Sequence, residues 1–180
     1  TKAVEAHETG VPMMRAMMLE YPDDRNCDYL ARQYFLGDSL LVAPVFSDQG
    51  MAEYYLPAGT WTSLLTGEAR QGGRWYREKH GYRSIPLYVR ENSIVALGAR
   101  DDDAVYDYAA GVTLQAYALQ DGARAQTTVY SGDNRAELTA RISRRGSTWH
   151  IRVEGTKPCR VALINAGTPT AADRPYRMEG

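Results

Sequence analysis

The chain has 180 residues, of which 44% are hydrophobic and 24% are charged. This composition allows a packed core and excludes global disorder, and the length fits one ordinary domain or two small ones. Lys and Arg number 21 against 22 Asp and Glu, so the net charge gives no electrostatic reason to expect a nucleic acid or a membrane as partner.

The first residues and the two cysteines bear on the length of the parent protein and on its compartment. The segment 1–8 has the pattern of the last turns of a helix closed by Gly10, and a chain that opens inside a helix is expected to be a piece of a longer protein. Cys27 and Cys159 are too few for a disulfide scaffold. We expect both to be buried free thiols in a reducing, cytoplasmic compartment.

The first 45 residues predict the closing end of an α/β barrel. The segment 11–19 is apolar apart from Arg15, which is typical of a strand buried on both faces in a parallel sheet. A turn follows at 22–24, then a short helix over 27–35 with apolar residues at helical spacing, then a second buried strand over 40–45. Strand, helix and strand in this order favour a barrel end. The apolar side chains of 11–19 should then need cover from barrel neighbours or from another surface.

After residue 45 the pattern is β throughout. Short alternating strands bounded by Gly and Pro indicate two sandwiches, separated by an acidic linker at 101–103. The expected strands are 51–56, 60–65, 74–80, 86–90 and 94–97, then 112–119, 125–130, 136–143, 148–153 and 159–164. The predicted fold is therefore mainly β: the end of a (β/α)8 barrel (1–45) followed by two small antiparallel β-sandwich domains (46–101 and 102–180). On this division, residues 46–180 should fold without the first 45.

Three acidic residues are candidates for sugar hydrolysis, which usually needs two facing carboxyl groups. Glu20, Asp23 and Asp24 follow the expected strand end, where barrel enzymes place active-site groups. Asp23 and Asp24 also follow a proline and fit turn chemistry. Arg15, within an apolar run, predicts a structural ion pair. Glu20 would lie on the opposite face of an ideal strand, so the partner of Arg15 is expected from elsewhere.

The remaining candidates are weaker. His7, His80 and His150 lack ligand spacing, and Ser39 and Ser84 lack a nucleophile elbow. The sequence predicts no metal and no cofactor.

The aromatic residues Trp61, Trp75 and Tyr76 leave two interpretations open. They could stack on a sugar ring in a carbohydrate-binding module, or they could pack in the core of the first sandwich, which we favour because aromatic residues dominate such cores. An exposed coplanar platform would indicate sugar binding, and buried rings would indicate a structural role.

Four blocks of sequence resemble glycoside hydrolase family 31, in the order of that family. They are GVPMMRAMMLEYPDD (10–24), RQYFLGDSLLVAPV (32–45), YLPAGTWT (55–62, with Gly67-Glu68 beyond) and PLYVRENSI (86–94). Together they cover about the first hundred residues. The segment 14–24, with CDYL at 27–30, is similar to the bacterial α-xylosidase branch. Residues after 103 are similar only loosely, as a distal β domain.

The resemblance implies a retaining, exo-acting α-glycosidase without a metal. Its nucleophile and its general acid/base, both Asp, and a substrate-binding His would precede Thr1; His7 does not match that His. We therefore assign no catalytic and no substrate-binding residue, although Arg15, Glu20 and Asp23 match motif positions that we interpret as structural. The implied function is to brace the catalytic barrel of an α-xylosidase or α-glucosidase, whose oligosaccharide substrate would bind in that barrel. The alternative is a carbohydrate-binding or oligomer-contact module, and a homo-oligomer fits either.

Overall fold

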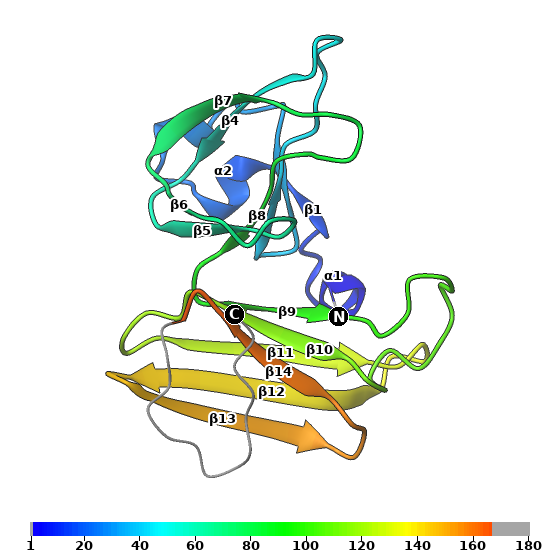
Figure 1. Ribbon diagram of the computed structural model, residues 1–180. Coiled ribbons are helices and arrows are strands. Elements are labelled where there is room, and N and C mark those ends of the chain that lie inside the picture. Colours follow the sequence, from blue (N-terminus) through cyan, green and yellow to red (C-terminus); the bar gives the residue numbers. More distant parts are fainter. Residues whose placement is uncertain (1, 167–180) are drawn as a thin grey trace.

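The computed structural model describes residues 2–166, which form two β lobes that lie one above the other in Figure 1. We call them the proximal domain (10–90) and the distal domain (93–166). A short link between β8 (Leu87–Arg90) and β9 (Ser93–Leu97) joins them. The mainly β prediction is confirmed. Among residues 2–166, no helix is long and apolar enough to span a membrane.

The proximal domain is preceded by helix α1 and consists of two antiparallel sheets. Its larger sheet has the order β1-β2-β3-β8-β5-β6, and β4 pairs with β7 in a second, two-stranded sheet. The elements before β8 are α1 (Lys2–Thr9), β1 (Met14–Arg15), α2 (Met17–Glu20), η1 (Arg25–Cys27), β2 (Tyr34–Leu36), β3 (Leu40–Val42), β4 (Met51–Leu56), β5 (Thr60–Ser63), β6 (Ala69–Gln71) and β7 (Arg74–Lys79).

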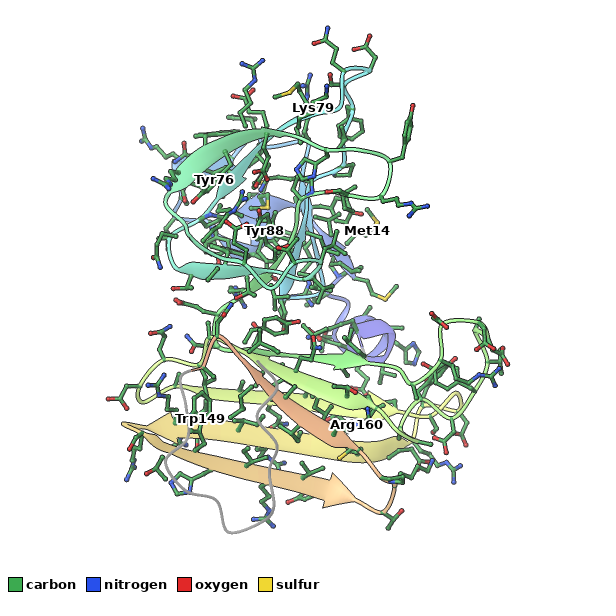
Figure 2. The ribbon with its side chains drawn as sticks, viewed as in Figure 1. Met14, Tyr76, Lys79, Tyr88, Trp149 and Arg160 are labelled. Atoms are coloured by element: carbon green, nitrogen blue, oxygen red, sulfur yellow. The ribbon has the colours of Figure 1, made fainter. Side chains whose placement is uncertain are left out.

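The proximal core lies between these sheets and is rich in aromatic side chains. Phe35, Tyr54 and Trp61 are completely buried, and the Phe35 and Trp61 ring centroids are 5.9 Å apart. Figure 2 shows Tyr76 and Tyr88 within the same lobe. Because core residues come from β2, β3, β4, β5 and β8, the first 45 residues supply part of this core.

The distal domain is a sandwich of two three-stranded sheets. One has the order β14-β10-β9 and the other β11-β12-β13. Its further strands are β10 (Thr113–Tyr117), β11 (Arg124–Tyr130), β12 (Ala136–Arg145), β13 (Thr148–Gly155) and β14 (Arg160–Ile164). The β10–β14 pair is parallel, so the expectation of an entirely antiparallel domain is wrong. The last strand returns from the far sheet and occupies the open edge of β10.

The predicted two-faced strand at 11–19 is wrong. Only Met14 and Arg15 are extended, and α2 begins at Met17. Met and Leu favour helix more than the β-branched residues that strands prefer, and this run contains only one β-branched residue, Val11. Met17 is completely buried, so the segment packs on the proximal domain through that side chain.

The predicted helix over 27–35 is also wrong. The 3-10 helix η1 ends at Cys27, and Tyr34 to Leu36 form β2, which pairs with β3. Gly37 has φ +66° at the turn that joins these two strands, a conformation that glycine adopts without strain. A hairpin closed by this turn therefore overrides the helical spacing of the apolar residues.

Both predicted domain boundaries cross a sheet. β3 pairs with β8 across residue 45, so residues 46–101 lack three strands of the six-stranded sheet. β9 pairs with β10 across residue 101, so it belongs to the distal domain. The division between the two lobes falls at Glu91 and Asn92, which lie between β8 and β9.

Side-chain hydrogen bonds fasten the two domains at this link. Asn92 has φ 58°, and its Oδ1 accepts a 2.7 Å bond from the Gln120 backbone N–H. Asn165 Nδ2 donates to Thr62 Oγ1 at 3.1 Å and to the Gly67 carbonyl at 3.0 Å. The distal domain is therefore bonded to the link by Gln120 and to the proximal domain near its end by Asn165.

Candidate functional site

The most connected polar group of the N-terminal region is Arg15. This residue is 5% exposed. Its guanidinium donates to Glu20 Oε1 at 2.6 Å, to Glu5 Oε1 at 2.8 Å and to the Pro12 carbonyl at 2.9 Å. Burial alone would lower the pKa of Arg15, but the bonds to the two glutamates raise it. The cation therefore stays charged and ties helix α1 to β1 and α2.

The predicted structural ion pair of Arg15 is present, both with Glu5 of α1 and with Glu20, which was not expected as a partner. Glu20 was expected to point away, but the chain leaves the extended conformation after Arg15, so α2 brings Glu20 back to it. Glu20 also lies 3.5 Å from the guanidinium of Arg90. The order Glu5, Arg15, Glu20, Arg90 is an alternating chain of charges that runs from α1 to β8.

Helix α1 is also fastened to the β2–β3 turn. Lys2 Nζ lies 2.7 Å from Asp38 Oδ2 and 2.7 Å from Glu5 Oε2. The hydrogen bonds from Lys2 and then from Arg15 lower the pKa of Glu5. Two independent ionic contacts therefore hold this helix against the proximal domain.

Beside these contacts lies a set of exposed apolar side chains, which we call the apolar strip. Each is between 38% and 60% exposed, and they come from the segment 11–19 and from β2. Met14 pairs with Leu36 in the β1–β2 ladder, and Figure 2 shows Met14 at the outer edge of the proximal lobe. The strip consists of Val11, Met13, Met14, Met18, Leu19 and Leu36. Exposed apolar side chains that gather on one segment and on the strand paired with it favour an interaction site.

The acidic candidates have structural contacts. Asp24 caps η1 by accepting the Asn26 backbone N–H at 3.0 Å, and its other oxygen accepts the Tyr55 hydroxyl at 2.8 Å. Burial and the bond to Asp24 raise the pKa of Tyr55 to about 12. Asp23 is exposed, and Glu20 is engaged by Arg15. The structure therefore gives Asp24 and Glu20 structural partners.

The three aromatic candidates do not form a platform. Trp61 is completely buried and donates its indole N–H to the Pro57 carbonyl at 2.8 Å. Tyr76 is half-buried and stacks on Tyr54 at 5.7 Å. Trp75 is 48% exposed, so the prediction that it is buried is wrong. It lies on the outward face of β7, tilted by 46° against Tyr55.

A polar cluster that the sequence did not indicate lies between the two proximal sheets. The Tyr54 hydroxyl lies 2.6 Å from Glu78 Oε1 and 2.9 Å from the Tyr88 hydroxyl. Arg70 donates to Tyr54 at 2.9 Å and to Glu78 at 2.8 Å. Burial alone would raise the pKa of Glu78, but the bonds from Tyr54 and Arg70 lower it. Arg70 comes from β6, a strand that was not predicted because Ala, Arg and Gln have no marked β preference.

Among the histidines, His80 lies between a serine and a carboxylate. His80 Nδ1 lies 2.7 Å from Ser84 Oγ, and its Nε2 lies 3.3 Å from Glu78 Oε1. Ser39 donates to Asp38 at 2.6 Å. Within the described part of the chain, no group of three His, Cys, Asp or Glu residues could hold a metal ion. Cys27 is a buried free thiol, whereas Cys159 is only half-buried.

Two cavities lie on the described surface, and the first adjoins Arg90. One, of about 290 Å³, is lined by Tyr21, Trp61, Arg90 and Glu91 with their neighbours. The other, of about 330 Å³, lies in the distal domain, and no carboxylate lines it. Glycoside hydrolysis needs two carboxyl groups on either side of the scissile bond, and neither cavity has more than one.

Comparison with known proteins gives a consistent assignment. Residues 10–95 match the family described as glycosyl hydrolase family 31 C-terminal domain, and residues 107–175 match the one described as alpha-xylosidase YicI, C-terminal domain. The chain is 45% identical over 116 residues to alpha-xylosidase XylQ of Lactiplantibacillus pentosus, a match that covers 63% of this chain and 15% of that protein.

Solved structures extend the match to both domains. The GH31 dextranase of Flavobacterium johnsoniae has a TM-score of 0.71 and 28% identity over 83% of this chain and 20% of its own. The GH31 alpha-xylosidase of Xanthomonas citri shows the same fold with a TM-score of 0.73, 24% identity, and coverage of 92% of this chain and 20% of that one.

Two β domains that match C-terminal family profiles define the class: residues 10–95 and 107–175 have the sequence pattern of C-terminal domains of glycoside hydrolases, and the fold agrees. The chain belongs to glycoside hydrolase family 31, and the resemblance read from its sequence is confirmed. It spans only 15% of the length of XylQ and 20% of the dextranase chain.

Proposed function

We propose that this chain is the C-terminal region of a retaining α-glycosidase, an α-xylosidase or α-glucosidase that hydrolyses terminal α-linked sugars, and that its role is to brace the catalytic barrel. The observation that carries the proposal is the attachment of α1. On this view α1 is the end of the barrel, and Glu5, Arg15 and Lys2 fasten it to the proximal domain.

The apolar strip supports the same role. Covering an apolar side chain contributes roughly 1.5–3 kcal/mol relative to full exposure, and the six members of the strip are only partly covered within this chain. The strip adjoins the Arg15 contacts, since Met14 and Met18 flank Arg15 and Met17 in sequence. A barrel that carries α1 would have its next surface against the strip.

The sugar specificity would be set outside this chain. The solved relatives are named for different activities, an alpha-xylosidase and a dextranase, while each shares this fold over about 20% of its chain. The two catalytic Asp residues are expected in the barrel that precedes residue 1, without a metal or cofactor. Two free cysteines also fit a reducing, cytoplasmic location.

The proposal is tested with the enzyme that includes the barrel. Replacing Met14 and Leu19 by Asp should lower both the melting temperature and the hydrolysis of 4-nitrophenyl α-D-xyloside and α-D-glucoside. Val105→Asp is the control, because Val105 is 81% exposed in the loop between β9 and β10 of the distal domain. If the M14D/L19D variant had the same melting temperature and activity as the V105D control, bracing by this chain would be contradicted.

Two further results would change the assignment. Turnover by the purified 180-residue chain alone, proportional to its concentration, would contradict catalysis in the barrel. Loss of a dimer in light scattering with M14D/L19D, at unchanged activity, would make the strip an oligomer contact instead.

A further inference from the structure

The distal cavity of about 330 Å³ lies at the end of the β11-β12-β13 sheet where β11 and β13 begin and β12 ends. Figure 2 shows Trp149 at this end of the lobe and Arg160 on the opposite side. The cavity is lined by Gly122, Arg124, Ser143, Arg144, Arg145 and His150. Its volume is at the lower limit of small-molecule sites, which begin at roughly 300 Å³.

The strand register explains why these side chains converge. Arg124 pairs with Ser143, and Ser143 pairs with His150, so the three form one row across three neighbouring strands. Directly paired residues project from the same face of a sheet. Arg145 lies two positions after Ser143 and therefore on that face as well. Two strands thus place the guanidinium groups of Arg124 and Arg145 at one corner, and the third strand places His150 beside them.

Arg144 forms a fixed wall of the cavity. Its guanidinium donates to the Leu119 carbonyl at 3.0 Å and to the Gly146 carbonyl at 2.8 Å. The same group lies 5.3 Å from the centre of the Trp149 ring. Its charge is not neutralised by these contacts, because both acceptors are neutral carbonyl groups. The charge is therefore held in place before any ligand arrives.

The other two arginines of the cavity have no acid to pair with. Within residues 2–166, neither Arg124 nor Arg145 has a carboxylate partner, and no carboxylate lines the cavity. The next arginines on the same sheet face are paired: Arg141 lies 3.2 Å and Arg152 lies 2.8 Å from Glu154. The nearest carboxylate in sequence, Asp121, accepts the Gly146 backbone N–H at 2.6 Å and does not line the cavity. Like charges gathered at one cavity repel one another, and a bound anion would relieve that repulsion.

We propose that this cavity is a binding site for a phosphate group. Guanidinium groups donate parallel pairs of hydrogen bonds that match phosphate oxygens, and a tetrahedral dianion can accept from several directions at once. His150 and Ser143 supply further donors at the rim. A planar carboxylate has one negative charge and two oxygens, so it would leave part of the cluster unpaired. The phosphate comes from inorganic phosphate or from a phosphorylated sugar.

The site is tested by calorimetric titration of the full 180-residue chain at fixed ionic strength. Inorganic phosphate and glucose 6-phosphate are the probes, with acetate and glucose as controls. We expect phosphate binding that acetate does not match. Tighter binding of glucose 6-phosphate than of inorganic phosphate assigns the site to a sugar phosphate, and equal binding assigns it to free phosphate. Failure of both probes to bind, or equal binding of acetate, overturns the proposal.

Substitutions distinguish phosphate binding at this cavity from non-specific attraction of phosphate to positive charge. Arg124→Gln and Arg145→Gln should each weaken phosphate binding about tenfold or more, the size expected for one charged hydrogen bond. Arg152→Gln is the matched control, since it removes the same charge two residues from His150 on the same strand face. An equal loss with R152Q would overturn the proposal. Phosphate-induced shifts of the Gly122 and Ser143 amide resonances localise binding in the unsubstituted chain, and their absence overturns it. Neither result affects the proposed glycosidase role.

Discussion

The two domains reach similar sandwich architectures with different cores. The proximal core contains Phe35, Tyr54, Trp61 and Tyr88, and six of the seven aromatic ring pairs of residues 2–166 lie in that domain. The distal core is mostly aliphatic, with Ile, Val, Leu and Ala from both sheets. The proximal domain also buries Arg15 and Gln33, whereas the buried polar residue of the described distal domain is Ser93.

This difference shows two ways of specifying a fold. In the distal domain, alternation of aliphatic and polar residues is enough to place each strand. In the proximal domain, individual polar groups pair with distant residues, as Gln33 does with both backbone groups of Tyr55 at 2.8 Å. A buried polar group without its partner costs about 1–3 kcal/mol. The proximal domain should therefore be more sensitive to single polar substitutions, and the two domains should respond independently.

The largest expected effect is that of deleting residues 1–45. The deletion removes β1, β2 and β3 from the six-stranded sheet and Met17, Phe35 and Leu41 from the core, so the proximal domain should unfold and the distal domain should remain folded. Heteronuclear NMR of the deleted chain measures both. Deletion of residues 1–10 alone is the control and should preserve both domains. A folded proximal domain after the longer deletion would contradict the assigned core.

Replacing Arg15 by Met should destabilise the proximal domain by about 3 kcal/mol, near the lower limit for breaking a buried ion pair, because Glu5 is partly exposed. Urea unfolding followed by tryptophan fluorescence measures the change. The control is Arg135→Met, whose pair with Asp133 is largely exposed and should contribute less than about 1 kcal/mol. If R15M and R135M lowered the free energy of unfolding by similar amounts, the proximal domain would not be the more sensitive of the two to polar substitutions.

Gln33→Met tests the hydrogen bonds to Tyr55 with little change in side-chain volume. The variant leaves the Tyr55 N–H and C=O unpaired in a buried setting and should lower the free energy of unfolding by about 2 kcal/mol. Gln33→Glu keeps the acceptor for the Tyr55 N–H but places a carboxylate against the Tyr55 carbonyl, so it should be no better tolerated. Urea midpoints for both variants give the comparison. Unchanged midpoints would show that water replaces these bonds.

The smallest expected effect is the dependence on pH through Glu78. Its pKa is lowered below the usual 4.5, so its contribution to stability is complete above pH 4.5 and is lost as the pH falls through the lowered pKa. Glu78→Gln should reduce the difference in unfolding free energy between neutral and acidic pH by about 1 kcal/mol. Thermal unfolding across this pH range measures it. An unchanged pH profile in the variant would contradict the role of the cluster.

The sequence predicted strands correctly where apolar and polar residues alternate along the chain. β4 has the predicted bounds, and β7 and β10 to β14 agree within two residues or so at each end. The first 45 residues were misread because their placement depends on non-local contacts. Nothing near Gln33 indicates that Tyr55 is its partner, and nothing near Arg15 distinguishes an extended segment from one that turns back at Ala16.

The polar sites were missed for related reasons. The cluster of Tyr54, Arg70 and Glu78 requires β6 beside β5, and β6 has no sequence signal of its own. The distal cavity was missed because the net charge near zero is an average over the whole chain and does not reveal a local group of arginines. The available signal was the pair Arg144-Arg145 at a hairpin with His150 soon after it, but only the strand register brings Arg124 to the same corner.

The contact between Asn165 and Thr62 joins residues 103 positions apart. During synthesis on the ribosome, the proximal domain has all its strands long before Asn165 leaves the exit tunnel. β14, which fills the open edge of β10, also emerges only at residues 160–164. The relative orientation of the two lobes is therefore set last, when translation has passed nearly all of the described chain. A premature stop codon before residue 160 would yield a proximal domain with all its strands. The distal domain of that product would lack β14 and the hydrogen bond from Asn165 to Thr62.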